Sequence, residues 1–135
     1  METGIKVGEC MKIQLTKISE TTSVIDAAKK MKEQNIGSLL VFDASEKVYG
    51  IVTGKDIVYR AVALNNLQIN VGQIASKPLM TITKDADIAE AASIMGNKQI
   101  RRLIVTNNSE IIGMVSEHDL VSISPSLYDL ICRQH

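Results

Sequence analysis

Two stretches of the chain share one pattern: Gly-Ile-Val-Thr-Gly-Lys-Asp-Ile at residues 50–57 and Gly-Met-Val-Ser-Glu-His-Asp-Leu at residues 113–120 (113 − 50 = 63). Each has a glycine, two apolar residues, a hydroxyl, two variable residues, an acid and an apolar residue. Upstream, the repeat spacing is one residue longer (71 − 7 = 64), because the second copy has lost one residue. Matches at this longer spacing include Val7-Gly8 with Val71-Gly72, Ala27-Ala28 with Ala91-Ala92, and Met31 with Met95. The chain is therefore an internal repeat, which predicts one supersecondary unit written twice.

The repeat divides the 135 residues into two short halves. We expect a first repeat over residues 7–64, a second over residues 71–124, and a tail over residues 125–135. Each half has about sixty residues and is marginal alone, so the two are expected to bury apolar faces against each other. The tail has a short apolar pattern, which is compatible with docking on the protein itself or on a neighbour.

Each repeat is predicted to run strand, helix, strand, strand, helix. Apolar residues at positions i, i+3, i+4 and i+7 predict amphipathic helices that begin near Val24 and Ile88, with their Ala and Met residues in the core. Asp87 and Glu90 resemble a capping pair at the start of the second of these helices. Apolar, β-type runs predict the strands Leu15–Ile18, Leu39–Phe42 and Val48–Thr53, and then Leu79–Ile82, Leu103–Thr106 and Ile111–Ser116.

The later strands of each repeat form a hairpin, because turn residues separate them. Short helices are expected from Gly54 and from Glu117, and Pro125 is expected to stop the second. The fold class predicted from these elements is α/β.

Charge and composition exclude several classes of function. Fifteen basic residues balance fifteen acidic ones, and aromatic residues make up 3% with no Trp. Nonspecific binding to nucleic acid or anionic membrane needs a basic excess, and single-strand binding needs aromatic stacking platforms. Cys10 and Cys132 show no metal or disulfide spacing, so reduced thiols are expected. Without a signal-peptide core or an apolar run of spanning length, the sequence predicts a soluble, cytoplasmic protein.

The repeated stretch has two interpretations. A hydroxyl three residues before an acid is a helix-capping pattern, which is a purely structural role. A strand that leads into a helix also presents backbone N–H groups, a hydroxyl and a carboxylate at one edge. A carboxylate only accepts hydrogen bonds, and its two oxygens match the adjacent hydroxyls of a ribose, at about 1.5–3 kcal/mol for each bond. Both interpretations can hold at once.

Catalytic patterns are incomplete. The run Gly50-x-x-x-Gly54-Lys55-Asp56 has one residue too few for a P-loop, and an acid where Mg²⁺ binding requires Ser or Thr. His118 and His135 have no second ligand at zinc spacing, and no Ser/His/acid or Cys/His set can be assembled. We therefore predict a binding module without a metal rather than an enzyme.

The two signatures Gly-x-Val-Thr/Ser-x-x-Asp-Ile/Leu resemble those of the cystathionine-β-synthase (CBS) domain pair, or Bateman module. Ala-Ala-x-x-Met at residues 27–31 and 91–95 resembles the family's first long helix, and residues 100–105 resemble the start of the strand after it. The resemblance covers roughly residues 7–124 and suggests a stand-alone module. It implies two βαββα units paired about a pseudo-twofold axis, with two clefts that commonly hold AMP, ADP, ATP or S-adenosylmethionine.

The resemblance also implies site residues, with each cleft taking its acid and hydroxyl from one repeat and its adenine-facing strand from the other. One cleft would combine Thr53 and Asp56 with Thr81 and Ile82. The other would combine Ser116 and Asp119 with Thr16 and Ile18, walled by Ile36 and Gly37. The isoleucines are also core candidates. An adenine plane needs apolar walls, so the two roles are compatible.

Phosphate needs local positive charge, for which Arg101 and Arg102 are the candidates. By analogy with the regulatory subunit of AMP-activated kinase, Arg101 would serve the cleft of Thr53, and Arg102 that of Ser116. The alternative is two solvated arginines at a strand end. The first repeat has Gly37 and Ser38 at these positions, so the two clefts need not be equally occupied. His118 stands where related sequences can carry a basic residue.

The sequence therefore predicts a regulatory sensor whose adenosyl ligand acts as a signal rather than as a cofactor. The apolar helices after Thr53 and Ser116 are expected to form a homodimer, and an unidentified protein would read the ligand state. The alternative is a structural protein–protein interaction module that binds no nucleotide. Nucleic-acid binding is the third hypothesis and is disfavoured by charge and aromatic content.

Overall fold

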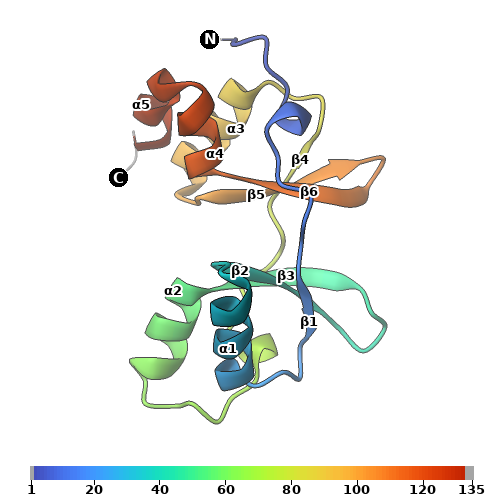
Figure 1. Ribbon diagram of the computed structural model, residues 1–135, viewed down its shortest axis with the longest axis vertical. Helices are drawn as coiled ribbons and strands as arrows, with labels where there is room; N and C mark the ends of the chain where they lie inside the picture. The colour runs from blue at the N-terminus through green and yellow to red at the C-terminus, as the bar shows by residue number, and fades with distance from the viewer. Residues whose placement is uncertain (1, 133–135) are drawn as a thin grey trace. The chain divides into compact units, whose positions relative to one another are not determined.

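The computed structural model describes residues 2–132 and divides into two compact units (Figure 1). The first-repeat unit is Leu15–Leu79. The second-repeat unit joins Met1–Gln14 to Met80–His135. Each unit therefore contains the first residues of the other repeat.

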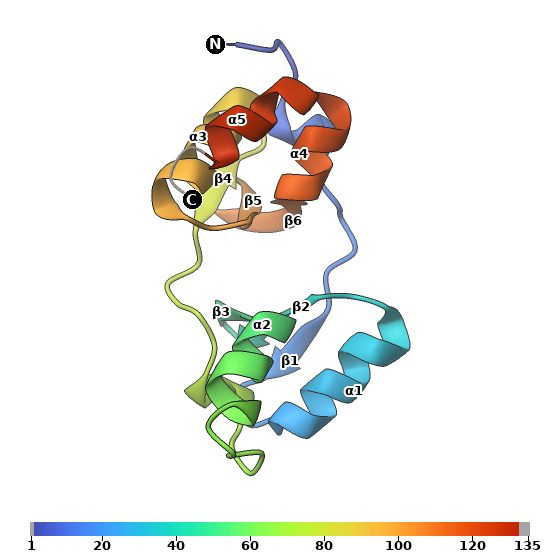
Figure 2. The same ribbon diagram turned by 90° about the vertical axis from the view of Figure 1, so that its left-hand side faces the viewer.

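The first-repeat unit is a three-stranded sheet with helices on one face (Figure 2). Strand β1 pairs in parallel with β2, and β2 pairs antiparallel with β3. A π-helical turn, η2, extends the short helix that follows the hairpin. The elements are β1 (Lys17–Ser19), α1 (Val24–Gln34), β2 (Ser38–Phe42), β3 (Val48–Thr53), α2 (Gly54–Ile57), η2 (Val58–Val62) and the 3-10 turn η3 (Val71–Gln73).

The second-repeat unit has the same order and pairing, with β4 parallel to β5 and β5 antiparallel to β6. The α/β class, the hairpins and the end of α4 before Pro125 confirm the predictions, although β1 and β4 begin two residues later than expected. In the described residues, no helix is long and apolar enough to cross a membrane. The elements are η1 (Val7–Glu9), β4 (Thr81–Thr83), α3 (Ile88–Lys98), β5 (Arg102–Asn107), β6 (Glu110–Ser116), α4 (Glu117–Ile123), η4 (Pro125–Leu127) and α5 (Tyr128–Ile131).

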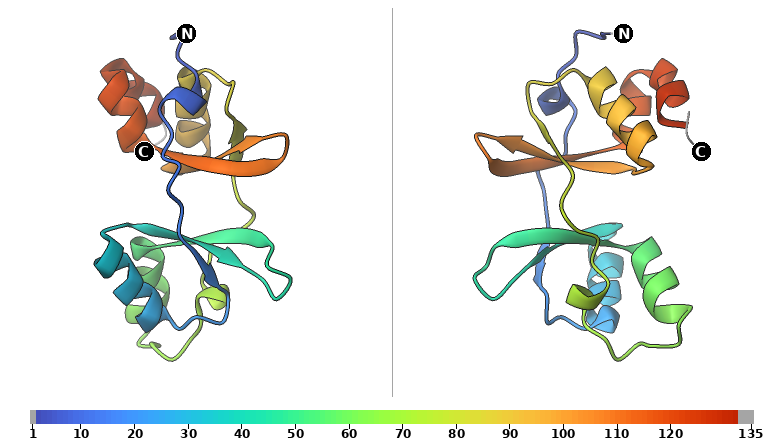
Figure 3. Two further views of the ribbon diagram at one scale, coloured as in Figure 1. Left: turned by 45° about the vertical axis from the view of Figure 1, so that its right-hand side comes forward. Right: turned by 180° about the vertical axis from the view of Figure 1, so that it is seen from behind.

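The exchanged segments are held by backbone hydrogen bonds. The N–H groups of Val7 and Gly8 donate to the carbonyls of Ala86 and Lys84, at 2.8 and 2.9 Å. The equivalent bonds in the other unit run from Val71 and Gly72 to Thr22 and Glu20, at 2.8 and 3.0 Å. Figure 3 shows η1, in blue, on the helix-bearing side of the sheet of the second-repeat unit. Each unit is thus completed by residues from the start of the other repeat.

The two cores follow the predicted helix stripes, with one exception. Val24, Ala27 and Met31 are buried in the first-repeat unit, as are their counterparts in the second. The prediction that Ala28 belongs to the core is wrong, because Ala28 is exposed whereas its counterpart Ala92 is fully buried. Ala28 lines an open groove instead.

The difference between the repeats arises from the C-terminal tail. Leu127 and Ile131 are fully buried, and α5 packs against α3. A Cβ at Gly96 would lie 2.1 Å from the carbonyl oxygen of Leu130, so only glycine permits this approach. The tail therefore docks on its own chain as far as Cys132, and residues 133–135 lie outside the described residues.

The start of α3 is tied to the N-terminal segment. Asp87 is the N-cap, as predicted, but its carboxylate accepts from the backbone N–H of Ala89 at 2.8 Å rather than from that of Glu90. It also accepts from the Thr3 hydroxyl at 2.8 Å and from the Gly4 N–H at 2.9 Å. These hydrogen bonds hold the pKa of Asp87 below its usual value, and the bond from Ala89 has the largest effect.

The charge on Asp87 should make stability depend on acid pH. Because folding lowers the pKa of this carboxyl from 3.8, its contribution is present above that value and is lost as the pH falls through the folded pKa. Urea unfolding between about pH 5 and pH 2 should show a steeper loss for the wild type than for Asp87→Asn. Asp85→Asn is the control, since the Asp85 side chain is 65% exposed in its pair with Lys6. Equal slopes for the wild type and Asp87→Asn would contradict the assignment.

Candidate functional site

The glycine of the repeated motif allows an incoming chain segment to pair with the hairpin. In the second-repeat unit, Lys12 and Met114 exchange backbone hydrogen bonds of 2.8 and 2.9 Å. In the first-repeat unit, Ser76 and Ile51 do the same at 2.8 and 3.0 Å. A Cβ on the preceding glycine of each hairpin, Gly113 or Gly50, would lie 2.8 or 2.9 Å from the incoming carbonyl. The motif therefore begins with glycine because a backbone passes directly over it.

The hydroxyl and the acid of the motif form capping boxes in both repeats. The Thr53 hydroxyl accepts from the Asp56 N–H at 3.2 Å, and Asp56 Oδ2 accepts from the Thr53 N–H at 2.9 Å. Ser116 and Asp119 repeat these bonds at 3.1 and 2.9 Å. The structural interpretation of the motif is confirmed, and it fixes the rotamer of each acid.

The second carboxylate oxygen of each acid has only long contacts in the described part of the chain. Asp56 Oδ1 lies 3.5 Å from the Ser76 hydroxyl and 3.9 Å from Arg60 Nε. Asp119 Oδ1 lies 3.8 Å from Lys12 Nζ. The two acid side chains are 12% and 11% exposed. Each acid thus has one oxygen that is held rigidly and a second that can accept better hydrogen bonds than it now has.

The isoleucines predicted from the strands are core residues. The side chains of Ile18 and Ile82 are buried, each in the core of its own unit, and Ile36 packs partly buried against the first of these cores. The side chains of Ile18 and Ile82 are therefore committed to packing, which leaves their backbone for any contact with a ligand.

The other predicted strand and loop residues are more open. Thr16 donates its hydroxyl proton to Gln34 Oε1 at 2.6 Å, and Thr81 is exposed. The Gly37 carbonyl accepts from the Gly54 N–H at 3.2 Å, which places Gly37 beside the motif of its own repeat. The pairing of residues from both repeats in one cleft stays a prediction.

The predicted phosphate-binding residues lie around the second motif. Arg101 forms an ion pair with Glu117, a partner that the sequence did not suggest. Arg102 begins β5 directly opposite Ser116. His118 is exposed, with Nε2 3.5 Å from the Ser122 hydroxyl. Their roles toward phosphate stay predictions.

Three residues beside the acids were missed from the sequence: Lys12, Ser76 and Arg60. The repeat itself carried a signal for two of them, because Lys12 and Ser76 are equivalent positions. Arg60 follows Asp56 by four residues, and its guanidinium also donates to the Ile74 carbonyl at 3.0 Å. Cys10 lies near Asp119, and burial first, then this negative charge, raises the pKa of its thiol.

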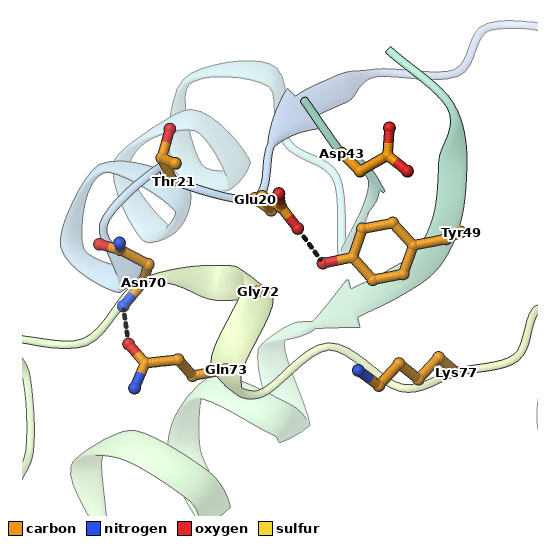
Figure 4. Close-up of a pocket in the computed structure, with 8 residues that line it drawn as sticks. All are labelled: Glu20, Thr21, Asp43, Tyr49, Asn70, Gly72, Gln73 and Lys77. Atoms are coloured by element: carbon orange, nitrogen blue, oxygen red, sulfur yellow. Dashed lines mark hydrogen bonds between the residues drawn. The ribbon is translucent and has the colours of Figure 1, made fainter. Parts of the chain in front are cut away.

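A separate hollow of about 520 Å³ lies in the first-repeat unit (Figure 4). The Tyr49 hydroxyl donates to Glu20 Oε1 at 2.9 Å, and Lys77 Nζ lies 5.7 Å from the ring centroid. Burial, followed by the Glu20 contact, raises the pKa of Tyr49. None of the predicted site residues lines this hollow, whose lining is Glu20, Thr21, Asp43, Tyr49, Asn70, Gly72, Gln73 and Lys77.

Two three-stranded units built on one repeated motif define a tandem CBS protein. The chain belongs to the CBS domain family, whose family model matches residues 7–63 and again residues 71–126. An uncharacterised protein from Methanopyrus kandleri is 32% identical over 127 residues, which cover 92% of this chain and 65% of that protein. The chain thus spans slightly less than two thirds of this relative's length.

Solved structures support the same fold. An uncharacterised conserved protein from Pyrococcus horikoshii has a TM-score of 0.84 at 26% identity, over 92% of this chain and 95% of that one. A CBS domain protein from Pyrobaculum aerophilum, solved in complex with AMP, has a TM-score of 0.80 at 25% identity, over 93% and 98% of the two chains.

Proposed function

We propose that this protein is a regulatory module that binds adenosyl ligands, of the class of AMP, ADP, ATP or S-adenosylmethionine. The observation that carries the proposal is the pair of equivalent acids, Asp56 and Asp119, each with Oδ2 fixed in a capping box and Oδ1 in long contacts. The AMP complex of the Pyrobaculum aerophilum protein supports this ligand class.

The proposed binding step is ribose recognition. The adjacent hydroxyls of a ribose donate to the Oδ1 atoms, replacing contacts of 3.5–3.9 Å with charge-assisted hydrogen bonds. Each capping box holds its carboxylate in place beforehand, so little side-chain entropy is lost on binding. Arg101 and Arg102 are the proposed partners of the phosphate groups, and the backbone at Ile18 and Ile82 that of the adenine.

The proposed role is regulatory, with no reaction catalysed. A ligand that binds one packing of the repeats better than another shifts the population toward that packing. A partner protein then reads the change, and the adenosyl group acts as the signal.

The module is also proposed to act as a homodimer through its helices. The exposed apolar side chains after Thr53 favour the second candidate, an interaction module without nucleotide.

Thermal unfolding with AMP, ADP, ATP and S-adenosylmethionine tests the proposal. A ligand at a hundredfold its dissociation constant should stabilise the protein by about 2.7 kcal/mol. Asp56→Asn and Asp119→Asn should each remove part of this gain, because an amide cannot accept a charge-assisted bond. Asp26→Asn, in the first turn of α1, is the matched control and should keep the full gain. If no adenosyl compound shifts the transition, the interaction module is the better description.

A further inference from the structure

The residue that faces each motif acid from the incoming segment differs between the repeats. Lys12 in the second-repeat unit and Ser76 in the first-repeat unit are equivalent positions (76 − 12 = 64), and paired backbone hydrogen bonds of 2.8–3.0 Å fix both. Lys12 Nζ lies 3.8 Å from Asp119 Oδ1. Ser76 Oγ lies 3.5 Å from Asp56 Oδ1. The fold thus directs one side chain at each acid, a cation in one repeat and a neutral hydroxyl in the other.

The ammonium group of Lys12 is held loosely. Its side chain is 65% exposed, and a separation of 3.8 Å is too long for a hydrogen bond. Such an ion pair constrains an exposed lysine only weakly, and the flexible aliphatic stem lets Nζ move without any change in the backbone. Asp119 is its one ion-pair partner among residues 2–132. Nζ can therefore turn to a stronger anion that arrives beside Asp119.

The cation beside the first-repeat acid is anchored instead. Arg60 Nε lies 3.9 Å from Asp56 Oδ1, and the same guanidinium donates to the Ile74 carbonyl at 3.0 Å. Moving Arg60 would break this second bond, and the Ser76 hydroxyl carries no charge to offer an anion. Of the two acids, only Asp119 thus has a neighbouring cation without a second anchor in the described part of the chain.

Ribose binding changes what Lys12 can contact. When the ribose hydroxyls donate to Asp119 Oδ1, they compete with the lysine for that oxygen. The 5′ substituent is carried on the same sugar ring, and a 5′-phosphate there offers Nζ charged oxygens in exchange. A nucleoside without phosphate offers no such exchange, so the lysine only competes with it. One cation therefore favours the phosphorylated ligand and opposes the unphosphorylated one.

We propose that Lys12 makes the second-repeat acid selective for adenosyl ligands that carry a 5′-phosphate. Its Nζ leaves Asp119 as the ribose binds and pairs with the phosphate. The selectivity rests on the proposed function, because it requires Asp119 to bind the ribose. It adds a phosphate partner besides Arg101 and Arg102, and it is absent from the first-repeat acid, which faces Ser76.

Calorimetric titration with AMP and with adenosine tests the selectivity. The Asp56→Asn background leaves Asp119 as the proposed ribose acid. In this background Lys12→Met should weaken AMP binding about tenfold, because one charge-assisted bond is lost. Adenosine binding should stay the same or become tighter, because its competitor is gone. Lys12→Arg keeps the charge and should keep the preference for AMP.

Lys6→Met is the matched control. Lys6 lies in the same unit, 3.8 Å from Asp85 Oδ1, with a side chain that is 60% exposed. The substitution removes the same charge from an ion pair of the same length and should leave both affinities unchanged. Thermal unfolding without ligand shows whether each variant folds.

Two results would overturn the selectivity of Lys12 alone. One is an equal change in the affinities for AMP and adenosine, or none, in Lys12→Met. The other is a wild-type protein that binds AMP while the Asp56→Asn protein binds neither compound, which leaves the proposed function at the first-repeat acid. A wild-type protein that binds no adenosyl compound contradicts the proposed function itself, and the selectivity with it.

Discussion

Gly96→Ala will detach the C-terminal helix and lower the free energy of unfolding by about 3–6 kcal/mol, the cost of exposing two large apolar side chains. The added methyl group would lie 2.1 Å from the Leu130 carbonyl oxygen, and a backbone atom cannot move aside as a flexible side chain can. Leu127 and Ile131, both fully buried, would then lose their packing. Urea denaturation gives the change in stability directly.

Gly54→Ala is the matched control for this substitution. A Cβ at Gly54 has no heavy atom within 4 Å, so the same chemical change should have little effect or stabilise slightly. Hydrogen exchange should show faster exchange of the α5 amides in Gly96→Ala and unchanged exchange in Gly54→Ala. Equal stability of the two variants would show that the approach of the tail to Gly96 does not constrain the fold.

Gly113→Ala will lower the free energy of unfolding by about 2–4 kcal/mol, from overpacking and two lost backbone hydrogen bonds. The new Cβ would lie 2.6 Å from Met11 Sδ and 2.8 Å from the Lys12 carbonyl oxygen. The methionine can rotate, but the carbonyl is fixed by its bond from Met114. The segment before Leu15 should therefore separate from β6.

The loss should be local to the second-repeat unit. Amide exchange at Lys12 and Met114 should accelerate strongly, whereas Ser76 and Ile51, which make the equivalent pair, should keep their protection. Gly50→Ala should reverse this pattern, since its Cβ would meet the Ser76 carbonyl at 2.9 Å. Uniform exchange across both pairs would contradict a local role for the glycines.

The elements that sequence predicts well here are those with strong local patterns. Val, Ile and Leu runs separated by turn residues gave β3 its observed bounds and placed the hairpins correctly. The capping boxes were also predictable, because they join residues only three positions apart.

The remainder depends on contacts between distant residues. Helical periodicity treats Ala28 and Ala92 alike, and only the docked tail makes one exposed and the other buried. Lys12 and Asp119 are more than a hundred positions apart in the sequence, so no local pattern predicts their contact. Strands β1 and β4 are three residues long and pair in parallel, which gives them little hydrophobic signal of their own.

The gene carries two successive copies of one motif, but a cut between them would not yield two working pieces. A fragment ending before Asn70 would lack the segment that pairs with Ile51, while keeping residues 2–14 that its own sheet does not use. For either half to be complete on its own, the starting segment of one repeat would have to be joined to the other repeat. Duplication of the motif in this protein therefore did not produce two repeats that are each complete on their own.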